Sequence, residues 1–238
     1  MKRKTSVRRA LLGKGPAPRF SGAMIISPGR RYIFVHIPKT GGTSLARALE
    51  GRAMKDDILV GDTPKARRRR GRVRGVTAAG RLWKHSTLAD IDGLVSPEDM
   101  AGMFCFTLVR NPWDRVVSYY HWLRDQRFDH PAVTLARALP FDGFLRDPQT
   151  QASLRAAPAA SYMRDAGGVD RAAAYVRIEA FARDARALFD HLGFDLTPGR
   201  ENASDRVADY RGYYDPSLRQ IVAETCAEDI ARFGYRFD

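Results

Sequence analysis

The chain has 238 residues, of which 44% are hydrophobic, which suits one compact domain with a full-sized core and argues against a second complete domain. Its two cysteines have no Cys or His neighbours at metal-ligand spacing, so we expect buried thiols and neither a disulfide framework nor a metal site. No apolar run is long enough to span a membrane or to serve as a signal sequence, and we therefore expect a cytoplasmic protein without a transmembrane segment.

The formal net charge of +13 raises the question of nucleic-acid binding, but its distribution weakens that interpretation. The basic residues in positions 1–14 and 65–74 together equal the whole excess of 13. Blocks of like charge are usually solvated and mobile, which predicts a disordered tail and a flexible loop. Two alternatives stay open, attraction of an anionic partner such as an acidic polysaccharide and non-specific contact with nucleic acid. We expect no specific nucleic-acid partner.

In chain order, residues 1–28 are basic and aperiodic, and we predict that they form a tail before a domain of residues 29–238. The first predicted strand is Tyr32–Val35, an apolar run rich in β-forming residues. A helix is expected soon afterwards, with Thr43 or Ser44 as its cap and apolar residues at helical spacing behind them.

The segment between this strand and this helix carries the strongest chemical signal. Its candidate phosphate-binding residues are Pro38, Lys39, Thr40, Gly41, Gly42, Thr43 and Ser44. Adjacent glycines let successive backbone N–H groups converge on an anion, and the following helix adds its free N–H groups and positive dipole end. A Walker A loop has its lysine after the glycines, whereas Lys39 precedes them, which disfavours nucleoside-triphosphate hydrolysis. The alternative is a simple glycine turn with a surface lysine.

Residues 61–80 contain Gly, Pro and the second basic block, and we predict a loop that orders with substrate. The next strand, residues 103–109, is apolar throughout, as is typical of a parallel strand buried on both faces. Asn111 can cap a helix that starts at Pro112.

Arg110 ends that strand, and Ser118 follows two turns into the next helix. Because ligands of open α/β sheets bind at the carboxyl edge, the Arg110 guanidinium and the Ser118 hydroxyl can face one pocket and bind a phosphate dianion. Alternatively, Arg110 is a structural ion-pair partner of Asp114.

The rest of the chain continues the alternation of strands and helices. We predict short helices over 131–168, a strand over 174–178, a helix over 181–192 and a final helix from Pro216 to about Gly234. This alternation predicts a single α/β domain with a central parallel sheet flanked by helices.

Taken together, two segments resemble the PAPS-dependent carbohydrate sulfotransferases, in particular their bacterial members and the Golgi heparan sulfate sulfotransferases. PAPS is 3'-phosphoadenosine 5'-phosphosulfate. The family's 5'-phosphosulfate loop is similar to residues 34–44, Phe34-Val35-His36-Ile37-Pro38-Lys39-Thr40-Gly41-Gly42-Thr43-Ser44. Its 3'-phosphate segment is similar to residues 106–118, Phe106-Thr107-Leu108-Val109-Arg110-Asn111-Pro112-Trp113-Asp114-Arg115-Val116-Val117-Ser118. Weaker likenesses lie at 177–179 and 213–235, so the resemblance covers roughly residues 30–238.

The resemblance implies a P-loop NTPase-like sulfotransferase fold and transfer of a sulfonate group from PAPS to a hydroxyl of a carbohydrate or glycoconjugate, which can be anionic. It implies that Lys39 contacts the phosphate next to the sulfonate, that residues 40–44 cradle this phosphate, and that Arg110 and Ser118 bind the 3'-phosphate. No metal is implied, and PAP is the expected product.

A base is needed because a neutral hydroxyl is a weak nucleophile, and histidine suits that role near neutral pH. His85 lies between the two phosphate motifs, where related sulfotransferases often have a catalytic histidine, and a surface or capping role is its alternative. His36 is expected to position the phosphate loop through a hydrogen bond. Two rival functions stay open, an ATP-dependent small-molecule kinase and a non-catalytic polyanion-binding protein on the same fold.

Overall fold

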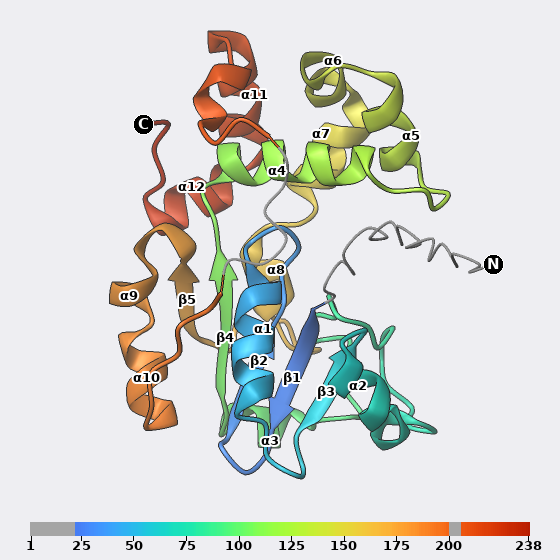
Figure 1. Cartoon of the computed structure of the whole chain (residues 1–238), viewed down its shortest axis with the longest axis vertical. Coiled ribbons are helices and arrows are strands. Elements are labelled where there is room, and N and C mark those ends of the chain that lie inside the picture. Colours follow the sequence, from blue (N-terminus) through green and yellow to red (C-terminus); the bar gives the residue numbers. More distant parts are fainter. Residues whose placement is uncertain (1–21, 200–205) are drawn as a thin grey trace, which may run out of the picture.

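The computed structural model describes residues 22–199 and 206–238, and these residues contain a five-stranded sheet (Figure 1). The strands are β1 (Ala23–Ser27), β2 (Tyr32–Val35), β3 (Ile58–Gly61), β4 (Phe104–Val109) and β5 (Ala172–Arg177), in the spatial order β3-β1-β2-β4-β5. Strands β2, β4 and β5 run parallel, whereas β1 is antiparallel to both of its neighbours. The α/β fold is confirmed, but the sheet is mixed rather than wholly parallel.

Strand β1 corrects the predicted boundary of the tail at residue 28. Its five residues are fully buried, and Ile25 pairs with Phe34 of β2 and with Leu59 of β3. The run Ala23–Ser27 is short and apolar, and a turn through residues 28–31 returns the chain into β2. The domain therefore begins before residue 28, while residues 1–21 lie outside the described part of the chain.

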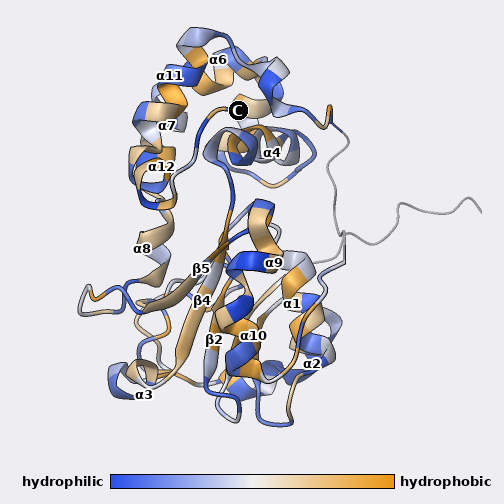
Figure 2. Ribbon diagram, turned by 90° about the vertical axis from the view of Figure 1, so that its left-hand side faces the viewer, coloured by the Kyte–Doolittle hydropathy of each residue, from blue (hydrophilic) through white to orange (hydrophobic). Residues whose placement is uncertain are grey.

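Alternate residues of each strand pack into two separate hydrophobic cores, because successive side chains of a strand point to opposite faces of the sheet. Phe34 and Phe106 pack on one face, with ring centroids 5.3 Å apart, and Ile33 and Cys105 pack on the other. Figure 2 shows the hydrophobic strands between two layers of helices. The first layer contains α1 (Gly42–Gly51), α9 (Phe181–Asp184) and α10 (Arg186–Leu192), and the second contains α3 (Pro97–Ala101) and α8 (Ala159–Met163).

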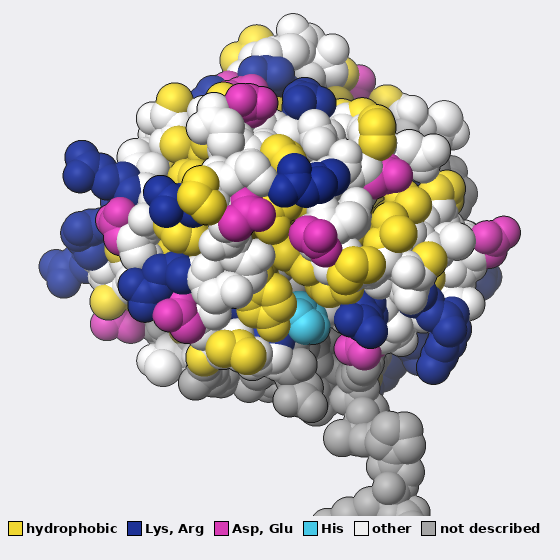
Figure 3. Space-filling model, turned by 90° about the horizontal axis from the view of Figure 1, so that it is seen from above, with side chains coloured by type: hydrophobic (Ala, Val, Ile, Leu, Met, Phe, Trp, Pro, Cys, Tyr) yellow, Lys and Arg dark blue, Asp and Glu magenta, His cyan; other side chains and the backbone are white. Residues whose placement is uncertain are grey.

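A third group of helices lies beyond the carboxyl edge of the parallel strands (Figures 1 and 2). It contains α4 (Pro112–Arg124), α5 (Pro131–Ala138), α6 (Phe141–Arg146), α7 (Pro148–Arg155), α11 (Pro216–Thr225) and α12 (Ala227–Phe233). The predicted final helix breaks at Cys226 and ends at Gly234, which has the left-handed conformation that glycine adopts without strain. Seen from above, this end of the molecule carries acidic and basic side chains interspersed among hydrophobic ones (Figure 3).

The second basic block is not the loop predicted for residues 61–80. It begins with α2 (Pro64–Arg69), which Thr63 caps by accepting a hydrogen bond from Ala66 N, and it continues as the 3-10 turn η1 (Arg70–Val73). Arg69 donates to the carbonyl oxygens of Met54 and Asp57, at 2.8 and 3.1 Å. The turn after α1 therefore orders part of the basic block, because cations are favourable beside the negative end of a helix dipole.

The structure also bears on the cysteines, on metal binding and on membrane-spanning helices. Both cysteines are free, and Cys105 is buried as expected, whereas Cys226 is only half-buried. Within residues 22–199 and 206–238, no cluster of three or more His, Cys, Asp or Glu side chains is arranged to hold a metal ion. None of the helices in that same part of the chain has both the length and the apolar character needed to cross a membrane.

Candidate functional site

The phosphate loop follows β2 and precedes α1, as the sequence predicts, but its cap differs from the prediction. Helix α1 begins at Gly42, and its cap is Gly41 in the left-handed conformation, with φ of 81°, rather than Thr43 or Ser44. Gly41 offers no side chain to cap the helix, and the backbone N–H of Ser44 donates to the carbonyl oxygen of Gly41 at 3.1 Å. The positive dipole end of α1 lies at this loop, where it favours an anion.

Gly42 and His36 explain why this loop needs a second glycine. A Cβ atom on Gly42 would lie 2.1 Å from Cδ2 of His36, which real side chains cannot tolerate. The His36 ring is buried against this glycine, and burial lowers the pKa of His36 well below its usual value, with His85 as a further cause. A neutral His36 thus packs under the loop, but its buried Nδ1 has no hydrogen-bond partner among the described residues, so the contact with the loop is packing rather than the hydrogen bond expected of that nitrogen.

Lys39 has the other unusual backbone conformation in the loop, with φ of 68°. L-residues other than glycine seldom adopt this left-handed region. The Lys39 ammonium lies 5.7 Å from the ring centroid of Trp122 on α4. Thr40, one residue later, is buried and donates its hydroxyl to the carbonyl oxygen of Ile37 at 2.9 Å. The Lys39 side chain therefore reaches α4, and the Thr40 hydroxyl fixes the loop through its own backbone.

Two arginines tie this loop to the second predicted motif. Arg110, at the end of β4, donates to the carbonyl oxygen of Lys39 at 3.3 Å, and Arg115 of α4 donates to that of Pro38 at 3.1 Å. Strand β4 lies directly beside β2, and Thr107 donates to the Val35 carbonyl at 2.8 Å. The sheet therefore brings the two sequence motifs together at one carboxyl edge, where open α/β sheets bind ligands.

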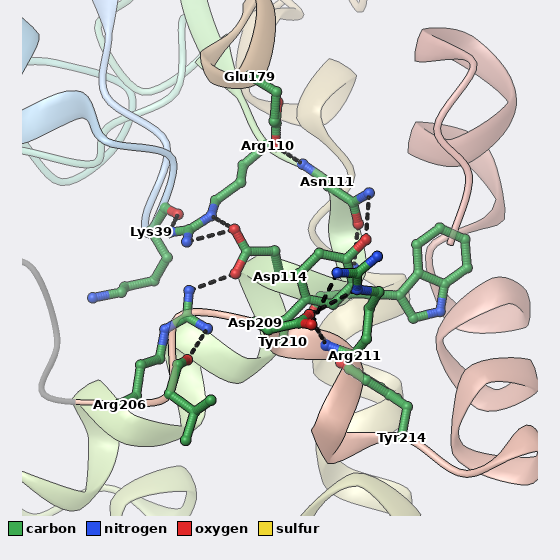
Figure 4. A network of polar contacts seen from close by, with 12 residues as sticks. Lys39, Arg110, Asn111, Asp114, Glu179, Arg206, Asp209, Tyr210, Arg211 and Tyr214 are labelled. Atoms are coloured by element: carbon green, nitrogen blue, oxygen red, sulfur yellow. Dashed lines mark hydrogen bonds and ion pairs between the residues drawn. The ribbon is translucent and has the colours of Figure 1, made fainter. Parts of the chain in front are cut away.

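The carboxylate of Asp114 holds two guanidinium groups in place (Figure 4). Arg110 donates to it from Nε at 2.8 Å and from Nη2 at 2.6 Å, and Arg206 donates from Nη2 at 2.5 Å. The ion-pair alternative for Arg110 is thus present in the structure, and it does not exclude phosphate binding. Ser118 is buried one helical turn after Asp114 on α4, and residues four apart share a helix face.

The start of α4 is fixed from several sides. Asn111 caps the helix by accepting from Trp113 N at 3.1 Å, as predicted, and its own backbone N–H donates to Glu179 at 2.6 Å. Tyr235 donates to the second oxygen of Glu179 at 3.3 Å. These contacts join the Arg110 motif to residues 177–179 and 213–235, the two segments with a weaker likeness to the carbohydrate sulfotransferases.

His85 lies beside the phosphate loop. Its Nδ1 is 2.6 Å from the carbonyl oxygen of His36, and the two imidazole rings meet edge to face with centroids 4.7 Å apart. A carbonyl oxygen only accepts, so Nδ1 carries the proton and Nε2 keeps a free lone pair. Burial lowers the pKa of His85 to about 4, so the imidazole is neutral at physiological pH. A neutral histidine with an unprotonated Nε2 can accept a proton.

Sequence reasoning missed several residues at this site. Arg206 follows a segment without a recognisable motif, and its role depends on a contact with Asp114 that is 92 positions away in sequence. Asp229 of α12 lies within 3.7 Å of Arg115, although no spacing rule relates the two. Arg115 itself lies inside the motif of residues 106–118. Its position one helical turn before Tyr119 was the signal that could have assigned it to the site.

The comparison with sequence models of protein families agrees with these motifs. The sequence model of the Sulfotransferase family matches residues 23–162, more than half of the chain and a range that contains both the phosphate loop and the Arg110 motif. Among solved structures, the crystal structure of the mouse sulfotransferase SULT7A1 complexed with PAP is similar, with 13% sequence identity, a TM-score of 0.42 and 84% of each chain covered. No curated protein gave a significant match.

Proposed function

The chain belongs to the sulfotransferase family and is a PAPS-dependent sulfotransferase, and from that premise we propose that it sulfates a hydroxyl of a carbohydrate or glycoconjugate. The meeting of the Lys39 loop, the Arg110 motif and His85 at one sheet edge supports the transfer chemistry. The resemblance of residues 34–44 and 106–118 to the carbohydrate sulfotransferases supports the acceptor class. The proposed sulfotransferase domain includes β1 and extends from residue 23 to residue 238. The cytoplasmic location stays a prediction.

The proposed donor site uses both phosphate motifs. The N–H groups at the start of α1, together with Thr40, Thr43 and Ser44, would bind the 5'-phosphate, and Lys39 would neutralise charge on the leaving group. Arg110 and Ser118 would bind the 3'-phosphate. Because Nε of Arg110 donates to Asp114, the phosphate would be bound by the second N–H of Nη1 and that of Nη2, which the contacts with Lys39 and Asp114 leave over. The contact between Arg110 and the Lys39 carbonyl supports the two subsites acting on one donor.

In the proposed reaction, the acceptor oxygen attacks sulfur and the bond between sulfur and the 5'-phosphate oxygen breaks. The proton of the attacking hydroxyl passes to Nε2 of His85, and the electron pair of the broken bond leaves with PAP. The hydrogen bond from Nδ1 to the His36 carbonyl supports this role, since it fixes the tautomer whose Nε2 is basic. A histidine pKa of about 4 makes a weak base, so the proton transfer must accompany the attack rather than precede it.

The test is incubation of the purified protein with 35S-labelled PAPS and a panel of glycans, with product detection by mass. Sulfated glycan is the expected product. In a parallel binding experiment, PAP should raise the melting temperature far more than ADP with magnesium does. Equal stabilisation by ADP would instead support the kinase alternative and would remove the 3'-phosphate role of Arg110 and Ser118.

A further inference from the structure

A cavity of about 150 Å³ opens beside the phosphate loop. Pro38 and Lys39 of that loop form part of its wall, and the rest comes from α4, from the end of α7 and the start of α8, and from the junction of α11 and α12. The cavity therefore shares Lys39 with the proposed donor site. Its volume is comparable to that of one small ring-shaped molecule.

Two tyrosines on its wall have hydroxyl groups that lack a hydrogen-bond partner within the described residues. Tyr119 comes from α4 and Tyr162 from α8, and both are half-buried. Burial is the main cause that raises the pKa of each phenol, so both hydroxyls stay protonated and can donate. Polar groups at such positions normally find a partner, in the protein, in water or in a ligand. The two tyrosines therefore offer a ligand two hydroxyl donors and two flat apolar ring faces.

The wall of the cavity also contains an ion pair between Arg115 and Asp229. The Nη1 of Arg115 lies 3.7 Å from one oxygen of Asp229, and the other oxygen accepts from Ala159 N at 2.8 Å. The Nε of the same arginine donates to the Pro38 carbonyl, so the pair is anchored to the phosphate loop. Glu228 and Arg155 also line the cavity. The wall thus combines carboxylates with cations, and it presents both acceptors and donors.

We propose that this cavity is the acceptor pocket, and that it takes a single polyhydroxylated ring, such as one sugar residue, with its hydroxyls bound by Tyr119 and Tyr162. This inference rests on the proposed function. A sugar ring offers C–H faces to the phenol rings and hydroxyls to their O–H groups. Because Lys39 belongs to both sites, a hydroxyl of the bound ring lies next to the sulfonate of the donor.

A phenolic acceptor is the rival occupant, and the tyrosine hydroxyls distinguish the two. A phenol has a single hydroxyl, which must face the donor, and its ring would pack on the tyrosine faces, so Tyr→Phe would leave its binding nearly unchanged. A sugar would lose one neutral hydrogen bond per substitution, which corresponds to about a 3- to 10-fold weaker interaction. The two substitutions keep the rings in place and therefore test recognition rather than packing.

The experiment measures the KM of methyl glycosides and of p-nitrophenol with wild type, Tyr119→Phe, Tyr162→Phe and the double variant. We expect the glycoside KM to rise 3- to 10-fold per substitution, with an unchanged kcat at saturation and an unchanged Kd for PAP. Tyr213→Phe is the matched control, because that tyrosine lies on the 3-10 turn η3 (Tyr210–Tyr213) and does not line the cavity. An unchanged glycoside KM in the double variant, or a better p-nitrophenol than glycoside substrate in wild type, would overturn the proposal.

Filling the cavity provides a second measurement that does not depend on turnover. Ser153 lines the cavity and its side chain is exposed, so Ser153→Trp can fill the space without disturbing the core. Calorimetry with PAP-loaded protein should show methyl glycoside binding to wild type and its loss in this variant, with PAP affinity intact. If wild type binds glycosides but sulfates none of them, the proposed carbohydrate sulfotransferase function is wrong, whereas the assignment of the cavity as a sugar-binding pocket is retained. If Ser153→Trp still binds glycosides as wild type does, the pocket assignment is wrong.

Discussion

His85 donates from Nδ1 to the carbonyl oxygen of His36, 2.6 Å away, across 49 positions of sequence. This contact links the segment that carries His85 to the end of β2, at the point where the phosphate loop begins. It also orients the imidazole, because the proton on Nδ1 leaves Nε2 as the only ring nitrogen with a lone pair. A residue between two distant motifs thereby becomes a neighbour of both.

The first prediction concerns that lone pair. His85→Ala should lower kcat for sulfonate transfer by about 100- to 10,000-fold, the usual contribution of a general base, with little change in the Kd for PAP. His85→Asn retains a donor for the His36 carbonyl but has no basic nitrogen, so it should lose as much activity while keeping more stability. Radiolabel transfer and PAP calorimetry on both variants test this prediction. A His85→Asn variant with wild-type kcat would show that another group accepts the proton.

The second prediction is a pH dependence of stability. Burial lowers the pKa of His85 to about 4 in the folded protein, against 6.5 when unfolded. Below pH 6.5 the unfolded chain takes up a proton that the native state does not bind until pH falls near 4, so the free energy of unfolding decreases as pH falls through this window. Each pKa unit corresponds to about 1.4 kcal/mol, which gives about 2 kcal/mol between pH 7 and pH 5.

Urea unfolding at a series of pH values measures this loss. His85→Asn cannot titrate, so its free energy of unfolding should fall less between pH 7 and pH 5 than that of wild type. Other groups, including the buried His36, titrate in both proteins, and the difference between the two curves isolates His85. Parallel curves would mean that His85 is solvated in the native state.

The sequence predicted the elements whose signals are local. Strands β2 and β4 are apolar runs, and α4 has a capping asparagine followed by proline. The glycines of the phosphate loop indicate a turn before a helix. Both phosphate motifs could be placed at one sheet edge because parallel strands end together. The same reasoning missed β1, because Ala23–Ser27 follows a long basic stretch and is recognisable only through its partners Phe34 and Leu59.

Contacts between distant segments could not be predicted in this way. Arg206, Asp229 and Tyr162 reach the site from regions without a motif, and their positions depend on how α8 and α12 pack beside α4. The basic block at 65–74 was misread for a related reason. Composition indicates a solvated loop, whereas the carbonyl oxygens that Arg69 binds become visible only once α1 and the turn after it are in place.

The third prediction tests the 3'-phosphate subsite. Arg110→Ala should weaken PAP binding about 10- to 100-fold, since hydrogen bonds to charged groups contribute roughly 1.5–3 kcal/mol. Binding of adenosine 5'-phosphate, which lacks the 3'-phosphate, should change less than about 3-fold. Asp114 keeps Arg206 as a partner in this variant, so the fold should survive. Equal weakening of both nucleotides would mean that Arg110 acts only through its contact with the Lys39 carbonyl.

The fourth prediction separates the structural from the solvated cations of the basic block. Arg69→Ala should lower the free energy of unfolding by about 1–2 kcal/mol, because the carbonyl oxygens of Met54 and Asp57 lose a charged donor close to the negative end of α1. Arg68→Ala is the matched control. Arg68 is exposed and makes no hydrogen bond or ion pair within the described ranges, so its removal should change stability by less than about 0.5 kcal/mol.

Salt and ligand binding complete this comparison. Part of the Arg69 contribution is electrostatic and should shrink in high salt, where exposed charges are screened. Neither variant should alter the Kd for PAP, because Arg69 lies near the carboxyl end of α1 and the phosphate loop adjoins its amino end. Similar losses of stability in Arg68→Ala and Arg69→Ala would contradict the structural role of Arg69. A loss of PAP affinity in either variant would show instead that the basic block serves the donor site.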